Sequence, residues 1–421
     1  MTAGRFSRRA FIAAGLTGSA AIALGGCNRA GDRDTLKIWA IGNEATALPA
    51  LLREQSIAGV EVQALPWSGA HQKLLTGYVG QSLPDLAQVG NSWLAELEAL
   101  GAIEPVPPEL AIGRDQFGAV LERNRSAGRL VAAPWYVDTR VQFYRKDLFA
   151  HAGHASPPLE WSEWKAALAT ISRQGGEDRF GVLLPLDEFE HLQGFALSAG
   201  ARFLDRDGVR GDFDSPEFLA ALEFYKSLFD ERLAPVVTGA QIANRWSDFA
   251  RGWYATYPSG PWMIGEMRSR LPPELQDSWG TAPNPGPDGA GAAAPGGSIL
   301  VVFARSSRKA EAWNVVSRLI GRDAQLALHR ATGDLPARRS VWSATELAQD
   351  SVVAPFARQL ELARPLPKIP EWERVVTEMQ VIADRMVRGE FSVREAAREM
   401  NRRIDDVLAK RRWMLERGSA S

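Results

Sequence analysis

The stretch "RLVAAPWYVDTRVQFYRKDLF", residues 129–149, decides how this chain is divided. Its pattern is that of one long extended segment, and it exceeds the length of an ordinary strand. Pro134 lies inside it, where a proline removes a backbone donor and favours a kink. We therefore predict a strand that crosses from one lobe of an α/β protein into a second lobe.

Strand-like and helix-like patterns alternate on both sides of this segment. Strands are predicted over residues 35–40, 60–65, 84–89, 179–184 and 299–304, and helices over residues 43–56, 91–103, 159–172, 215–231, 309–321, 371–389 and 392–408. Because a helix separates the first two strands, they should be parallel neighbours joined by a crossover. Residues 279–298, rich in glycine and proline, are predicted to form a loop. Ser392 and Glu395 are predicted to form a capping box.

The first 27 residues have the features of an exported lipoprotein. Two arginines in "SRRAFI", residues 7–12, precede a small apolar run and then the block "LGGC", which ends at Cys27. The run is too short to span a bilayer, and its flank is basic, as in a signal peptide. The block resembles a bacterial lipoprotein signal. This resemblance implies twin-arginine export of residues 1–27, lipid on Cys27 and a linker over residues 28–34, with the protein held outside the cytoplasm at a membrane.

Length and composition limit the class of protein. A chain of 421 residues is long for a single core, which favours two lobes. Its 49 basic and 50 acidic side chains nearly cancel, so nucleic acid is not an expected partner. Cys27 is the only cysteine, which excludes a disulfide framework and a cysteine-based metal site. Fourteen tryptophans against six tyrosines point to aromatic surfaces.

Motifs for catalysis, metal binding and cofactor binding are missing from the sequence. His151 and His154 lie three apart in a loop rich in glycine and proline, with no third ligand nearby, so we expect no metal site. The sequence has no phosphate-binding loop, dinucleotide fingerprint or nucleophile elbow, and no cofactor is predicted. The many carboxylates leave a secreted glycoside hydrolase or lyase as an alternative, although nothing in the sequence fixes two of them at a useful separation.

Aromatic rings and hydrogen-bonding side chains recur in the loops where predicted strands end. They are Trp67, His71, Gln72, Asn91, Trp93, Trp135, Tyr136, Asp138, Tyr257, Trp262, Asp334, Arg338 and Arg339. A sugar presents C–H faces that stack on aromatic rings, and hydroxyl groups that pair with carboxylates and guanidinium groups. This combination predicts a saccharide-binding site.

The stretch "TYPSGPWMIGEM", residues 256–267, places an aromatic ring at the start of a predicted helix. A turn over residues 258–261 should open this helix, with Pro261 at its first position. Trp262 lies off the apolar stripe and beside Tyr257, so we predict that both rings form part of the sugar cleft. The alternative is that Trp262 packs against the neighbouring strand. The stripe itself consists of Met263, Ile264, Met267 and Leu271.

Eight phrases in a fixed order resemble one family of proteins. They are "TLKIWA", "SLPDLAQVGNSWLAELEALGAIEPV", "GRLVAAPWYVDTRVQFYRKDLFAHAG", "PLEWSEWKAAL", "SGPWMIGEM", "GGSILVVFARSSRKAEAWNVVSRLI", "TGDLPARRSVW" and "ARPLPKIPEWERV". From Leu36 to about Leu408 the chain resembles a family 1 extracellular solute-binding protein, the sugar-capturing component of a bacterial ABC importer.

This resemblance implies a type II periplasmic-binding-protein fold. Two α/β lobes would be joined by a hinge, with a ligand cleft between them that closes on binding. The first lobe would take residues 35–140 and 298–337, and the second residues 141–297 and 338–421.

The family pattern also implies roles for particular residues. It places an acid at Glu44, an aromatic and an acid that contact sugar at Tyr136 and Asp138, and a cleft-lining turn at Gly296, Gly297 and Ser298, followed by an arginine at Arg338. The sequence departs from some relatives in two places. Ser298 stands where a stacking tryptophan can occur, and Gly90-Asn91 where an aspartate can occur, so Trp67, Trp93 or Trp262 become the stacking candidates.

The implied function is capture of a mono- or oligosaccharide for import. A disaccharide of glucose such as trehalose or maltose is the expected ligand, and a polyol or another small solute is the alternative within the same fold. The expected partners are ABC permease subunits with a cytoplasmic ATPase, and the protein is expected to be a monomer.

Overall fold

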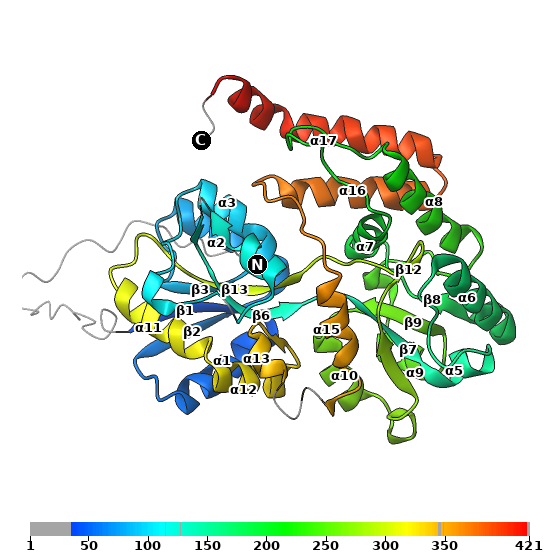
Figure 1. Cartoon of the computed structure of the whole chain (residues 1–421), viewed down its shortest axis with the longest axis horizontal. Coiled ribbons are helices and arrows are strands. Elements are labelled where there is room, and N and C mark those ends of the chain that lie inside the picture. Colours follow the sequence, from blue (N-terminus) through cyan, green and yellow to red (C-terminus); the bar gives the residue numbers. More distant parts are fainter. Residues whose placement is uncertain (1–34, 114, 127, 344–346, 348, 419–421) are drawn as a thin grey trace, which may run out of the picture. The chain divides into compact units, whose positions relative to one another are not determined.

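A six-stranded sheet combines segments from distant parts of the chain (Figure 1). The computed structural model describes residues 35–418 apart from residues 114, 127, 344–346 and 348; the predicted signal peptide, Cys27 and the linker lie outside the described residues. The order of the strands is β14 (Leu335–Pro336), β6 (Ala133–Asp138), β13 (Gly296–Val302), β3 (Leu86–Gly90), β1 (Leu36–Ile41) and β2 (Val60–Leu65).

The first two strands confirm the predicted crossover. β1 pairs in parallel with β2, with Leu36 opposite Val60, and helix α1 (Gly42–Glu54) connects them. Ile38 of β1 faces a core shared with α1, while Trp39 faces a core shared with other helices. The helices that cover the sheet are α1, α11 (Lys309–Leu319) and α12 (Arg322–Thr332) in one core, and α2 (Trp67–Val79) and α3 (Leu94–Ala99) in the other. The sheet is therefore buried on both faces, as its apolar strands require.

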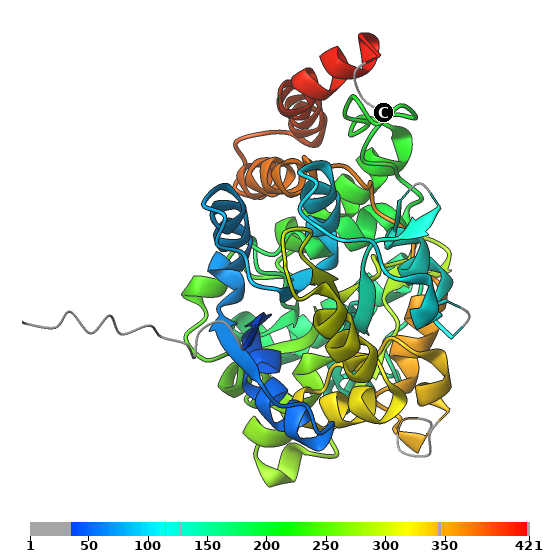
Figure 2. The same ribbon diagram turned by 90° about the vertical axis from the view of Figure 1, so that its left-hand side faces the viewer.

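A second sheet of four strands has its own cores. Its order is β10 (Trp279–Ala282), β7 (Val141–Arg145), β9 (Tyr254–Ser259) and β8 (Phe180–Val182). Around it lie α5 (Lys146–His151), α6 (Trp161–Gly175), α7 (Glu190–Ser198), α8 (Pro216–Asp230), α9 (Arg245–Ala250), α10 (Trp262–Arg270), α15 (Ala354–Glu361), α16 (Trp372–Val387) and α17 (Val393–Glu416). Figures 1 and 2 show α16 and α17 side by side, and the two helices contact each other.

Short elements complete the described chain. They are α4 (Gly118–Arg123), β4 (Arg125–Ser126), β5 (Arg129–Leu130), β11 (Pro285–Gly286), β12 (Gly289–Ala290), α13 (Arg339–Trp342) and 3₁₀ turns at Asn91–Trp93, Pro108–Leu110, Gly176–Asp178, Gly239–Gln241 and Pro273–Leu275.

The long extended segment over residues 129–149 is not one strand. It contains β6 in the first sheet and β7 in the second, and Thr139 and Arg140 separate them. The irregularity expected at Pro134 is a bulge. Ser298 pairs with Tyr136, but the next residue of β13 pairs with Pro134, so Trp135 is left without an opposite residue.

Several local predictions need correction, because pairing with distant segments overrides composition. Residues 279–298 are not a loop: they contain β10, the hairpin β11–β12 and the start of β13. Trp67, His71 and Gln72 lie on helix α2 rather than in a loop. The helix expected from residue 91 begins at Leu94, after a 3₁₀ turn, and residues 258–259 end β9 rather than form a turn.

Two predictions of helix detail are confirmed. Ser392 and Glu395 form the capping box of α17, in which each side chain accepts from the other residue's backbone N–H. The apolar stripe of α10 is buried. Pro261, predicted at the first position of that helix, is instead its N-cap, and the helix begins at Trp262.

Gly297 is a position where the fold should not tolerate a side chain. Its φ is +108°, and a Cβ there would lie 2.3 Å from the Tyr136 carbonyl oxygen on β6. Gly153 also has a positive φ, of +89°, but open space around the position of a Cβ. Gly153→Ala should therefore lower the free energy of unfolding only by the cost of the left-handed backbone conformation, about 1–2 kcal/mol. Gly297→Ala should lower it by clearly more, because β6 must also move. Urea unfolding of both variants measures the difference, and equal losses would contradict the steric argument.

Candidate ligand-binding site

A cavity of about 570 Å³ lies where the two sheets approach each other. From the first sheet, its lining comes from the residues that follow β1 and β3 and from the end of β6. Among the helices around the second sheet, α7, α10 and the start of α16 also contribute residues to the lining. The volume is typical of small-molecule sites, which span about 300–1,000 Å³, and in open α/β sheets ligands bind beyond the carboxyl ends of strands.

Two buried carboxyl groups meet on one wall of this cavity. Glu44 lies in the first turn of α1, where the helix N-terminus favours a negative charge, and the hydroxyl of Tyr136 donates a hydrogen bond to it. The side chain of Asp334 is hydrogen-bonded to Glu44. Burial raises the pKa of Asp334 well above its ordinary value, and the charge of Glu44 raises it further. The buried environment therefore favours the neutral form of Asp334, which can donate its proton in the hydrogen bond to Glu44.

A layer behind Tyr136 fixes the position of this pair. The Ser298 hydroxyl donates to the Tyr136 hydroxyl at 3.0 Å, and the Gln88 amide donates to Ser298 at 3.2 Å. Gln88 itself accepts from the Ile41 backbone N–H at 2.7 Å, at the end of β1. The carboxyl pair is therefore held by four strands of the first sheet, β6, β13, β3 and β1.

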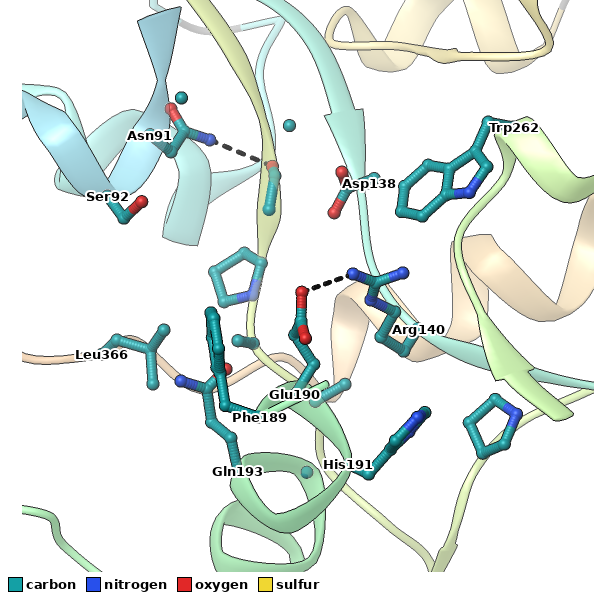
Figure 3. A pocket seen from close by; sticks show the side chains of 18 of the residues that line it. Asn91, Ser92, Asp138, Arg140, Phe189, Glu190, His191, Gln193, Trp262 and Leu366 are labelled. Atoms are coloured by element: carbon teal, nitrogen blue, oxygen red, sulfur yellow. Dashed lines mark hydrogen bonds and ion pairs between the residues drawn. The ribbon is translucent and has the colours of Figure 1, made fainter. Parts of the chain in front are cut away.

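Asp138 and Arg140 flank the junction between the sheets (Figure 3). Burial raises the pKa of Asp138 to about 6; the charge of Arg140 acts against this shift, and the charges of Glu190 and Glu44 add to it. Arg140 forms an ion pair of 2.7 Å with Glu190. Burial alone would lower the pKa of Arg140, but the nearby carboxylates, Glu190 first, raise it above its ordinary value. The guanidinium therefore stays charged.

Trp262 supplies an aromatic surface beside these charges. The guanidinium carbon of Arg140 lies 4.6 Å from the centroid of the Trp262 ring, and Figure 3 shows the two side chains next to each other. Two further tryptophans, Trp67 and Trp93, also line the cavity, with ring centroids 5.7 Å apart. Trp67 is 43% exposed, which leaves much of its ring open to a partner.

The cavity brings together most of the residues that the sequence singled out. Glu44, Trp67, Asn91, Trp93, Tyr136, Asp138, Trp262, Gly296 and Gly297 line it. Asn91 donates from Nδ2 to the Gly296 carbonyl at 3.0 Å, which joins the end of β3 to the start of β13.

Asp334 also lines the cavity, whereas seven predicted residues, Trp135 and Arg339 among them, do not. His71 pairs with Glu96 at 2.8 Å, and Gln72 is exposed on α2. Tyr257 is buried, and its hydroxyl binds Glu188 and Arg245. Ser298 lies behind Tyr136, and Arg338 is hydrogen-bonded to Asp115 at 2.8 Å.

Several lining residues were missed by the sequence prediction. They are Arg123, Arg140, Glu190, His191, Gln193 and Glu373. Arg140 had a usable signal, because it follows Asp138 by two residues at the predicted crossing. The others lie on helices that reach the cavity only through packing against distant segments, and no local pattern marks them.

The described residues hold no group of three or more histidine, cysteine or acidic side chains that fits a metal ion. In the same part of the chain, no helix has the length and apolar character needed to cross a membrane. The site is therefore one of rings, carboxyl groups and guanidinium groups.

Known proteins resemble this chain in sequence and in fold. A family model described as a bacterial extracellular solute-binding protein matches residues 44–326. The chain belongs to this family. A solved structure of the sugar-binding protein MalE from Xanthomonas citri is 41% identical to this solute-binding protein, with a TM-score of 0.85 over 91% of this chain and 99% of that one. This match confirms the predicted family and the two-lobe periplasmic-binding-protein fold.

Two curated relatives extend the comparison. The diacetylchitobiose binding protein DasA of Streptomyces coelicolor is 25% identical over 394 residues, covering 87% of this chain and 91% of its own. A maltotriose-binding protein of Pyrococcus abyssi is 23% identical over 319 residues, covering 72% of this chain and 66% of its own. The solute-binding protein is thus a binding protein and not an enzyme, and the hydrolase alternative is set aside.

The raised pKa of Asp138 predicts a pH-dependent stability. An unfolded aspartate has a pKa of about 3.9, so between this value and the folded value of about 6 the folded state binds more protons. The contribution of Asp138 to the free energy of unfolding is present below that window, falls as the pH rises through it, and is lost above it.

Asp138→Asn cannot ionise, so the variant should gain stability relative to the unsubstituted protein as the pH rises from about 4 to about 6, by on the order of 1–3 kcal/mol. Urea unfolding at several pH values measures this difference. Asp207→Asn, at an exposed position, serves as the control. A stability difference for Asp138→Asn that does not change with pH would contradict the prediction.

Proposed function

We propose that this solute-binding protein captures a sugar in the cavity and delivers it to an ABC importer. The observation that carries the proposal is the wall on which Trp262 lies beside Asp138 and Arg140. The proposed ligand is a mono- or oligosaccharide, and a disaccharide of glucose such as maltose or trehalose is the form we propose first. The names of the relatives, which bind maltotriose or diacetylchitobiose, support this class of ligand.

The chemistry of the wall suits a neutral polyhydroxyl compound. The indole of Trp262 can stack on the C–H face of a sugar ring. Glu44 and Asp138 can accept hydrogen bonds from hydroxyl groups, and Arg140 can donate to them. Arg140 is already paired with Glu190, so the wall offers hydrogen bonds without an unbalanced positive charge.

Transport requires partners outside this chain. In the proposed function, sugar binding closes the two lobes, and the closed form engages permease subunits that work with a cytoplasmic ATPase. The protein acts as a monomer, held outside the cytoplasm at the membrane by lipid on Cys27.

A thermal-shift panel tests the ligand class. A ligand present at 100 times its Kd adds about 2.7 kcal/mol to the free energy of unfolding, so binding sugars will raise the Tm. The panel contains glucose, maltose, trehalose, maltotriose and a polyol such as mannitol. Shifts with the sugars support the proposal, while a shift with the polyol alone would replace it with polyol capture.

Trp262→Ala should abolish most sugar binding with little loss of fold stability. The ring is half-buried, and the buried face of its helix does not include it. Removal of a stacked indole should weaken affinity by several kcal/mol, whereas a core tryptophan would cost about 3–5 kcal/mol of stability instead. Isothermal titration with maltose and the Tm without ligand measure the two effects.

Trp413→Ala is the matched control, because Trp413 is 52% exposed on α17 and does not line the cavity. A large fall in Tm for Trp262→Ala, with affinity retained, would assign the ring to packing.

Cys27→Ala should release the protein from membranes. The prediction rests on the lipoprotein block that ends at this cysteine. Stable anchoring requires more than one acyl chain, which lipoprotein processing supplies. Fractionation of cells that produce the full chain measures the distribution, and a variant that stays with the membranes would mean that another segment anchors the protein.

A further inference from the structure

Arg123 is a buried cation with unused hydrogen-bond donors. It ends helix α4, lines the ligand cavity and is only 8% exposed. Among the described residues, its Nε and Nη1 atoms have no hydrogen-bond partner. Burial lowers the pKa of Arg123 to about 10, and the charge of Glu373 acts in the opposite direction. A buried charge whose donors have no partner lowers the stability of the protein without ligand.

Glu373 faces the same cavity without touching Arg123. It lies in the first turn of α16, is half-buried and lines the cavity. Its charge acts on Arg123, yet in the described part of the chain no ion pair joins the two. A cation and a carboxylate that face one cavity but do not meet leave room for a group between them.

Two other charged side chains of the cavity are already paired. Arg140 pairs with Glu190, and Glu44 accepts from Tyr136 and Asp334. Arg123 therefore differs from Arg140, the other arginine of the cavity, in lacking a protein partner among the residues that the structure describes.

The end of the cavity that holds Glu373 lies near the turn that follows β3. Helix α16 contacts the 3₁₀ turn at Asn91–Trp93. Asn91 lies across the pocket from Trp262 in Figure 3, and its Oδ1 also has no partner among the described residues. The cavity therefore holds the unused donors of Arg123 and, across from Trp262, the unused acceptor of Asn91.

We propose that Arg123 and Glu373 bind hydroxyl groups of a second sugar unit and so give a disaccharide a higher affinity than a monosaccharide. Arg123 donates to a hydroxyl oxygen, and Glu373 accepts from a hydroxyl proton. A hydroxyl group does both, whereas a carboxylate on the sugar would be repelled by Glu373 and an amine by Arg123. The inference rests on the proposed function, in which the first unit occupies the Trp262 wall, and it predicts that a neutral disaccharide binds more tightly than a single sugar unit.

Arg123→Met tests the inference through two separate measurements. Titration should show affinity for maltose reduced about tenfold to a hundredfold, the range for a lost hydrogen bond to a charged group, with affinity for glucose changed less than about twofold. The Tm without ligand should stay equal or rise, because an apolar side chain replaces an uncompensated buried charge. Glu373→Gln should show the same selective loss, and Arg129→Met, at an exposed position, should show none.

The outcomes separate this inference from the function on which it rests. A lower Tm with equal losses for both sugars would make Arg123 a structural residue, and unchanged affinity for maltose would remove it from the site. In either case, loss of maltose binding in Trp262→Ala would leave the proposed function standing. If the unsubstituted protein binds none of glucose, maltose and trehalose, both proposals fail together.

Discussion

Two residues, Thr139 and Arg140, separate strands that belong to different sheets, and the site depends on this junction. A second segment crosses beside it. Thr139 donates from its hydroxyl to the Ala294 carbonyl, and Asn284 donates to the Arg140 carbonyl. Because both crossings are tied at the same place, the side chains of Asp138 and Arg140 lie at the meeting point of the sheets, where the cavity forms.

Charge balance within the cavity favours the neutral solute that we propose as the ligand. Arg140 is compensated by Glu190, and the Glu44 and Asp334 side chains are hydrogen-bonded to each other in an environment that favours the neutral form of Asp334. An anionic ligand would have to compete with these carboxyl groups in a partly desolvated space. Hydroxyl groups add hydrogen bonds without adding charge, which is the requirement of a reversible binder.

Local sequence pattern was sufficient to predict the structure where the hydrogen-bonding and packing partners of a segment lie within that segment. The crossover of β1, α1 and β2 and the capping box of α17 depend on neighbours within the segment, and both were predicted. Local pattern failed where a distant strand supplies the partner. β10 is rich in small residues and follows no clear alternation, yet it becomes a strand because β7 offers it a hydrogen-bonding edge.

The sequence by itself determined the family, the α/β class and the residue types of the site. The tertiary structure alone decided which side chains face the cavity. Tyr257 and Trp262 are close in sequence, but the Tyr257 side chain is buried and its hydroxyl donates to Glu188, while Trp262 borders the cavity. Arg123 and Glu373 belong to distant helices with no pattern in common, and they face one space only after both lobes have packed. The physical reason is that exposure and hydrogen-bond partners are properties of non-local neighbours, which periodicity along the chain does not encode.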